Sequence, residues 1–106
     1  MAPRHLSEDD TINATEPPYA RHARQDREKI LELLLATSAV SQLDRESLEG
    51  KIVHEALAEW ARRKTPISLR GALATVCRLH EPCAKVTLEC RKTLIKAWHQ
   101  AHTRTA

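Results

Sequence analysis

The apolar residues of this chain recur at the spacing of an α-helix, and nowhere do they alternate at strand spacing over a useful length. Only two glycines occur among its 106 residues, so little interrupts the helical pattern. A chain of this length has room for one domain. We therefore expect an all-α fold, a compact bundle of four to five short helices that begins after Pro18.

The first predicted helix spans about residues 19–38, with Pro18 in its first turn. Its Leu and Ile residues cover an arc of about 200°, which is wide enough for two neighbours. Residues 41–44, Ser-Gln-Leu-Asp, resemble a capping box that opens the next element. Because Gly50 interrupts the apolar register, we expect a short helix over 44–49 and a longer one over 51–64.

Two further helices complete the predicted bundle. Thr65 and Pro66 suit the N-cap and first position of a helix, which should stop at Glu81 because that residue precedes a proline. The last helix covers about residues 84–102. Trp98 lies at core spacing on it, with the basic residues on a separate stripe. The core that we expect consists of Leu34, Leu57, Trp60, Leu73, Val76, Leu94 and Trp98.

The first 18 residues, MAPRHLSEDDTINATEPP, differ in composition from the rest. They contain few large apolar residues and an acidic cluster, so we expect a disordered N-terminal tail over 1–18 and a folded domain over 19–104. The tail lacks the apolar stretch of a signal peptide. No apolar run in the chain approaches the length that crosses a bilayer.

Charge is divided unevenly along the chain. Residues 1–61 carry a net charge of −5 and residues 62–106 a net charge of +8, which together give the overall +3. A basic half predicts an acidic partner, either a peptide or a nucleic acid. The alternative is a solvated basic face that pairs only with the acidic half of the same chain. Nucleic-acid binding is the weaker hypothesis, because only three aromatic residues occur and none forms a stacking platform.

Metal binding and catalysis receive little support from the sequence. Cys77, His80 and Cys83, with Cys90 or His99 nearby, have the identities of zinc ligands but not the paired spacing. Three cysteines without a secretory signal indicate free thiols, some of them small core residues. The chain has no glycine-rich phosphate loop, nucleophile elbow or His-Glu-x-x-His pattern. We expect no metal, no cofactor and no enzymatic activity.

Several segments resemble the N-terminal domain of the transcription elongation factor TFIIS, the LW domain. The strongest is 93-TLIKAWHQ-100, which is similar to the basic last helix of that family, and Pro66-Ile67-Ser68 and Thr75-Val76 resemble earlier segments. The resemblance covers roughly residues 22–102. It implies an LW-domain-like bundle that is no enzyme but a docking module of the transcription machinery, which binds short disordered acidic-hydrophobic motifs.

On this resemblance we expect a nuclear monomer without a membrane partner. The basic half would then hold the acidic flank of the bound motif. The residues that we expect to contact the partner are Arg62, Arg63, Lys64, Arg78, His80, Lys92 and Lys96. A small basic helical domain that binds nucleic acid is the alternative function.

Overall fold

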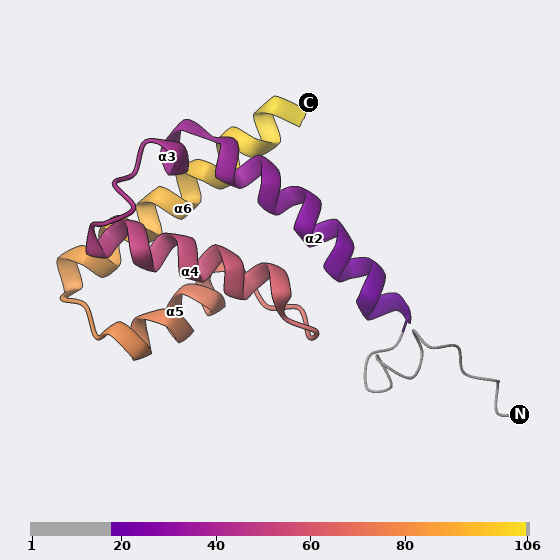
Figure 1. The fold of residues 1–106 in the computed structure, drawn as a ribbon, viewed down its shortest axis with the longest axis horizontal. Helices are drawn as coiled ribbons and strands as arrows, with labels where there is room; N and C mark the ends of the chain where they lie inside the picture. Colours follow the sequence, from indigo (N-terminus) through magenta and orange to yellow (C-terminus); the bar gives the residue numbers. More distant parts are fainter. Residues whose placement is uncertain (1–17, 106) are drawn as a thin grey trace, which may run out of the picture.

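The computed structural model describes the backbone of residues 18–105 and the side chains of residues 25–103, and its elements are all helices (Figure 1). They are α2 (Pro18–Ala36), α3 (Ser38–Ser41), α4 (Leu48–Arg62), α5 (Leu69–His80) and α6 (Ala84–Thr105). The predicted all-α bundle is confirmed. The tail expected over residues 1–18 lies outside the described residues, except for Pro18, which begins α2.

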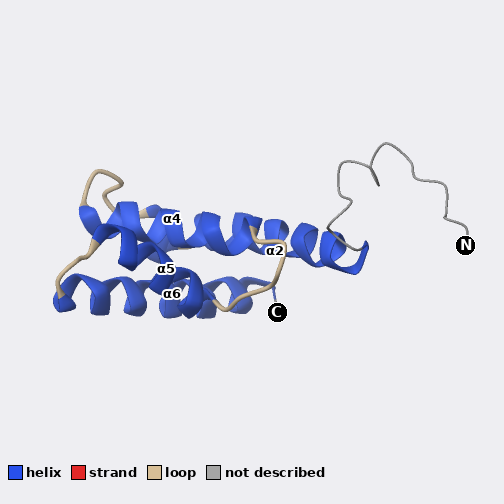
Figure 2. Cartoon of the chain, turned by 90° about the horizontal axis from the view of Figure 1, so that it is seen from below, coloured by secondary structure: helices blue, strands red, loops and turns tan. Residues whose placement is uncertain are grey.

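Helix α4 is the centre of the bundle, because it packs against α2, α5 and α6. Figure 2 shows α6 running along one side of the bundle, below α2 and α4. The wide apolar arc of α2 serves two main neighbours, α4 and α6, as its width predicts. No helix within residues 18–105 is both long enough and apolar enough to cross a membrane.

The core follows the apolar stripes of the sequence. Six of the residues expected there are buried: Leu34, Leu57, Trp60, Leu73, Val76 and Leu94. Trp98 differs from them, since it is only partly buried and packs at the edge of the core. Helix α4 supplies the largest share of buried side chains, which include Ile52, Val53, Ala56 and Ala61.

Two serines, not the predicted caps, begin the central helices. Ser47 accepts a hydrogen bond from the Gly50 N–H at 3.0 Å and begins α4, and Ser68 accepts one from the Gly71 N–H at 3.0 Å and begins α5. The expected starts at residues 41–44 and at Thr65-Pro66 are therefore wrong. Both true caps share the pattern Ser-Leu-x-Gly, which places each glycine at the third helical position.

Gly50 lies inside one continuous helix, α4, and does not interrupt it. The prediction of two helices over 44–49 and 51–64 is therefore wrong. The preceding turn folds back over the first turn of α4. There the Asp44 carbonyl accepts hydrogen bonds from the N–H and the hydroxyl of Ser47, at 3.0 and 2.6 Å. A Cβ on Gly50 would lie 2.1 Å from this same carbonyl oxygen. Gly50 is therefore required by the close approach of the turn.

Helix α5 ends where the sequence predicts, at the residues before Pro82. Glu81 adopts a left-handed conformation, with φ of 48° and ψ of 52°, and its N–H donates to the Cys77 carbonyl at 2.7 Å. This is the ordinary way for a helix to stop, although glycine is the more common residue at the left-handed position. The short connection that follows turns the chain into α6.

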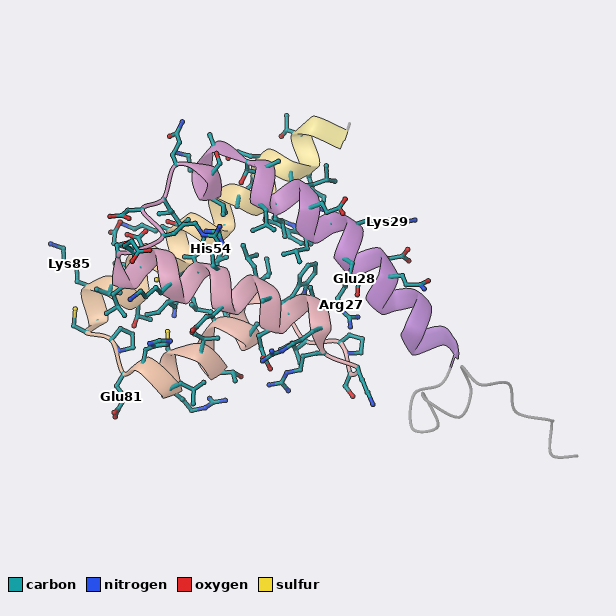
Figure 3. The ribbon with its side chains drawn as sticks, viewed as in Figure 1. Arg27, Glu28, Lys29, His54, Glu81 and Lys85 are labelled. Carbon is teal, nitrogen blue, oxygen red and sulfur yellow. The ribbon has the colours of Figure 1, made fainter. Side chains whose placement is uncertain are left out.

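Arg27 is a buried cation that joins α2 to the end of α4. It is 7% exposed, and its Nε donates to the Trp60 carbonyl at 3.2 Å while its Nη2 donates to the Arg63 carbonyl. Both carbonyls lie in the last turn or cap of α4, where no intrahelical donor remains. The guanidinium also offsets the partial negative charge at this helix end. Figure 3 shows Arg27 turned toward α4 and Lys29 turned away.

The close approach at Gly50 gives a prediction on stability. Gly50→Ala should lower the free energy of unfolding by at least about 2 kcal/mol, because the turn or the helix must shift to admit the methyl group. Gly71→Ala is the matched control, since its added Cβ meets its nearest neighbour, the Ser68 hydroxyl, at 3.4 Å. It should leave stability unchanged or raise it by up to about 1 kcal/mol. Urea denaturation measures both variants, and equal losses would contradict the assignment.

A second prediction concerns the buried cation. Arg27→Met keeps the aliphatic bulk but leaves two carbonyls at the end of α4 without their donor. It should therefore cost about 2–3 kcal/mol of unfolding free energy. Lys29→Met, on the exposed side of the same helix, should change stability by less than about 0.5 kcal/mol. Denaturant titration of the two variants measures their unfolding free energies. An Arg27→Met variant as stable as the wild type would rule out a stabilising role of Arg27.

Candidate functional site

An apolar hollow on the described surface lies between α5 and α6, and Trp60 of α4 forms part of its wall. We call it the tryptophan cleft, and its volume is about 440 Å³. That is within the size range of ligand-binding pockets. Its lining is mostly apolar, with a few polar groups: Trp60, Ser68, Leu69, Arg70, Leu73, Arg91, Leu94, Ile95, Trp98 and His99.

The two tryptophans form one end of the cleft. Their rings meet edge to face, with centroids 6.1 Å apart and planes at 89°. Trp60 is 6% exposed and anchors the pair in the core, while Trp98 is only partly covered and presents ring surface to the cleft. The aromatic pair therefore contacts the core and also lines the cleft, and the core spacing of Trp98 predicts only the first of these.

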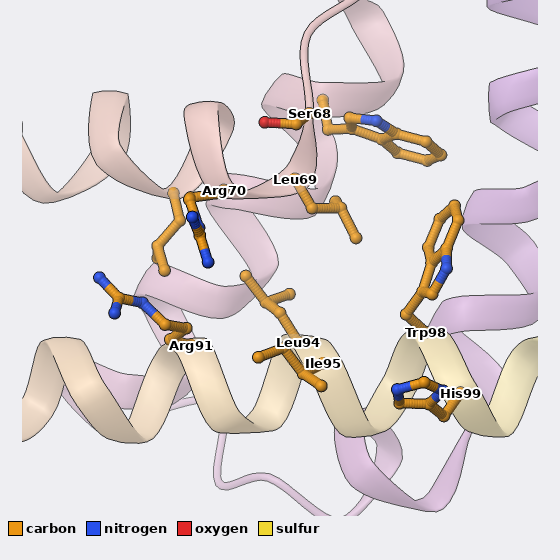
Figure 4. A pocket seen from close by; sticks show the side chains of 10 residues that line it. Ser68, Leu69, Arg70, Arg91, Leu94, Ile95, Trp98 and His99 are labelled. Carbon is orange, nitrogen blue, oxygen red and sulfur yellow. The ribbon is translucent and has the colours of Figure 1, made fainter.

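Two arginines lie at the opposite end of the cleft. Figure 4 shows Arg70 of α5 and Arg91 of α6 together, with Leu94 and Ile95 between them and Trp98. Both arginines are exposed, and neither forms a hydrogen bond or ion pair with other side chains among residues 25–103. None of the ten lining residues is acidic. The cleft thus changes along its length from aromatic to cationic.

A second hollow continues the tryptophan cleft toward the other end of α5. We call the two hollows together the groove. Its volume is about 360 Å³, and it shares Arg70, Leu73 and Arg91 with the tryptophan cleft. Arg78 and Pro82 line its far part. The arginines of the two hollows therefore form a basic rim along the line between α5 and α6.

Most of the residues predicted to contact a partner lie elsewhere and are engaged within the chain. Arg62 and Arg63 both bond the Glu59 carboxylate, and the hydrogen bonds from Arg62 and then Arg63 hold the pKa of Glu59 below its usual value. His80 lies 2.5 Å from the Glu55 carboxylate, and Lys92 lies 3.7 Å from Glu89. None of these four basic residues lines the tryptophan cleft.

The remaining three predicted residues also lie off the cleft. Lys64 is in the loop before α5, and Lys96 is exposed on α6. Arg78 lines the second hollow, and its Nη2 donates to the Thr75 hydroxyl at 3.3 Å. None of the seven residues predicted to contact a partner therefore lines the tryptophan cleft, and one of them, Arg78, lines the second hollow.

Arg91 could have been found from the sequence. It precedes Trp98 by seven residues, which is two helical turns, so both side chains lie on the same face of α6. Lys92 and Lys96 lie about 100° and 140° around the helix from Arg91. Arg70 carries a weaker signal, because its place on the cleft depends on how α5 packs against α6.

The cysteines show no sign of a shared site. Cys83 is exposed, Cys77 is partly buried, and Cys90 is buried. Burial, with the Glu49 carboxylate as second cause, raises the pKa of the Cys90 thiol to about 12, so this thiol stays protonated and packs as a small apolar group. Among the side chains of residues 25–103, no three His, Cys, Asp or Glu residues are grouped closely enough to hold a metal ion.

His54 is an unusual titratable group on α4. It lines a small hollow of about 240 Å³ together with Leu35, Val40, Ser41 and Arg45. Its Nε2 is buried and lacks a hydrogen-bond partner among the described residues. Burial, followed by the charge of Arg45, lowers the pKa of His54 below its usual value. The imidazole is therefore neutral near pH 7.

Comparison with known proteins assigns no family, because no family model, curated protein or solved structure matches this chain. The function is accordingly argued from the geometry and charge of the cleft.

The environment of His54 predicts how stability depends on pH. Its pKa is lower in the folded state than in the unfolded one, so the unfolded chain binds the proton more readily. Stability should fall as the pH drops below about 6.5, the ordinary value for histidine. His54→Gln should flatten this loss, whereas His99→Gln, an exposed control, should keep it. Thermal melts between pH 7.5 and 5.5 measure this dependence. If the melting temperatures of the wild type and of His54→Gln fall in parallel, His54 is not the group responsible.

Proposed function

We propose that this protein is an interaction module that binds short acidic-hydrophobic peptide segments in the tryptophan cleft. One observation carries the proposal: a concave apolar wall with two tryptophans ends at two arginines that have no partner among the described side chains. An apolar side chain would fill the aromatic end, and a carboxylate would meet the arginines.

The cleft suggests the spacing of the bound motif. Arg91 and Trp98 are two helical turns apart, which is about 10 Å along α6. In an extended peptide, residues three apart are separated by about 10 Å. The motif would therefore place Asp or Glu three residues from a large apolar residue.

The chemistry of the rim supports a peptide ligand. Arginine binds carboxylates through two parallel hydrogen bonds, and it loses less solvation than lysine when it does so. Buried aromatic rings and arginines are also the residues that contribute most to protein interfaces. A duplex would need a broader run of cations without carboxylate partners, and Arg62, Arg63 and Lys92 form ion pairs with carboxylates of this chain.

The biological setting is part of the same proposal. The resemblance of 93-TLIKAWHQ-100 to the last helix of the LW domain favours a place in the transcription elongation machinery, and hence in the nucleus. That segment contains Leu94, Ile95 and Trp98, which all line the cleft. The module would act as a monomer without a cofactor and without catalysis.

Charge reversal on the rim tests the proposal. The probe is a short fluorescein-labelled peptide with one Leu and an Asp pair that begins three residues after it. Arg70→Glu combined with Arg91→Glu should weaken its binding about tenfold, which is 1.4 kcal/mol, because the acidic flank would then be repelled. Fluorescence anisotropy gives the dissociation constants, and binding to the wild type should weaken as salt is added.

The matched control is Lys92→Glu combined with Lys96→Glu. It makes the same change in net charge on exposed positions, but off the cleft. It should weaken binding far less than the rim pair does. Equal effects of the two pairs would show that only overall charge matters. A DNA duplex that binds the wild type more tightly than the peptide at physiological salt would replace the docking function with nucleic-acid binding.

A further inference from the structure

The chain itself contains a segment of the kind that the cleft would bind. Residues 6–12, Leu-Ser-Glu-Asp-Asp-Thr-Ile, which we call the acidic segment, have three consecutive carboxylates between two large apolar residues. Leu6 precedes Asp9 by three residues, which is the spacing inferred from Arg91 and Trp98. The acidic segment lies within residues 1–17, outside the described part of the chain.

The charges of the segment and of the groove are complementary. The acidic segment has a net charge of −3, and the rim contributes Arg70, Arg78 and Arg91. Neither hollow of the groove has an acidic residue in its lining except Glu81, at the far end of the second. The segment would therefore meet cations along most of the groove.

The connecting chain is long enough for the segment to reach the cleft. Arg27, whose guanidinium bonds the Trp60 carbonyl, is nine residues from Pro18, so about 14 Å of helix separates Pro18 from the contact with α4. Twelve residues lead from Pro18 back to Leu6, and an extended chain of that length spans about 40 Å. This leaves ample length to pass the end of α4 and reach the two tryptophans.

We infer that the acidic segment occupies the tryptophan cleft of its own chain, with Leu6 against the tryptophans and Asp9 near Arg70 and Arg91, and thereby competes with external partners. The inference rests on the proposed function of the cleft. A tethered ligand acts at an effective concentration near 1 mM, so the segment would weaken the binding of every external peptide once its own dissociation constant is below that concentration. External partners must then displace it.

The test uses the full chain with three neutralising changes, Glu8→Gln, Asp9→Asn and Asp10→Asn. The chain has two tryptophans, so its indole N–H groups give two signals in a nitrogen-proton correlation spectrum, assigned with Trp98→Phe. Neutralising the segment should shift the Trp98 signal. It should also lower the dissociation constant of a labelled peptide that copies residues 4–14 by at least about twofold, because competition by the tethered copy is lost.

A matched variant separates a specific contact from a general charge effect. Asp26→Asn, Glu28→Gln and Glu32→Gln make the same change in net charge on exposed positions of α2. This variant should leave the Trp98 signal in place and the peptide affinity close to that of the wild type. An equal response of the two triple variants would overturn the inference. Leu6→Ala should release the cleft as the neutralising changes do, and no response to it would exclude Leu6 as the anchor.

The outcomes also distinguish the two proposals. If the copied peptide binds through Arg70 and Arg91 while the neutralising changes have no effect, the docking function stands and self-occupation is refuted. If the peptide does not bind either triple variant or the wild type, both proposals fail. A Trp98 signal that moves on dilution would show that the segment enters the cleft of a second copy, which overturns occupation within one chain.

Discussion

The bonds from Arg27 to the end of α4 are the constraint on which the rest of the fold depends. Residues 27 and 60 are far apart in the sequence, and the Nε of Arg27 reaches the Trp60 carbonyl at 3.2 Å within the buried interface of α2 and α4. A buried guanidinium is tolerated only where its donors find acceptors, so it fixes the position of α2 against the last turn of α4. That turn carries Trp60, and its position in turn sets the wall of the tryptophan cleft.

The cleft illustrates why the number of basic residues is a poor guide to a basic site. The half of the chain after residue 61 is strongly cationic, but Arg62, Arg63 and His80 each lie beside a carboxylate of α4. Surface pairs of this kind contribute little to stability, yet they reduce the charge available to a partner. Arg70 and Arg91, which have no such carboxylate among the described residues, stand next to the apolar hollow.

The sequence predicts the fold class and most of the core because both follow from a helical period that packing does not alter. It fails at the helix starts. Gly50 suggested a break, and Pro66 suggested a first helical position, but the repeated Ser-Leu-x-Gly pattern at residues 47–50 and 68–71 holds the real caps. Propensity scales treat glycine as a helix breaker, although at the third position a required close approach can favour it.

The site was harder to predict than the fold. Periodicity predicts Trp98 as a core residue, but it cannot show how much of that helix face a neighbouring helix covers. Arg91 shares this face, so its position on the cleft could be predicted from the sequence. The position of Arg70 on the cleft could not be predicted in this way, because it depends on how α5 packs against α6. Residue spacing within one helix carries no information on that packing.

The approach of the Asp44 carbonyl to Gly50 has a consequence for the evolution of this chain. Selection at position 50 acts on the space available to the backbone, so this position should remain glycine even in descendants in which the residues of the cleft have changed. Position 71, where a methyl group fits, should accept alanine over the same period. A difference in substitution rate between these two glycines, which occupy equivalent positions in their caps, would therefore result from the backbone of the turn beside Gly50. It would not result from selection for binding.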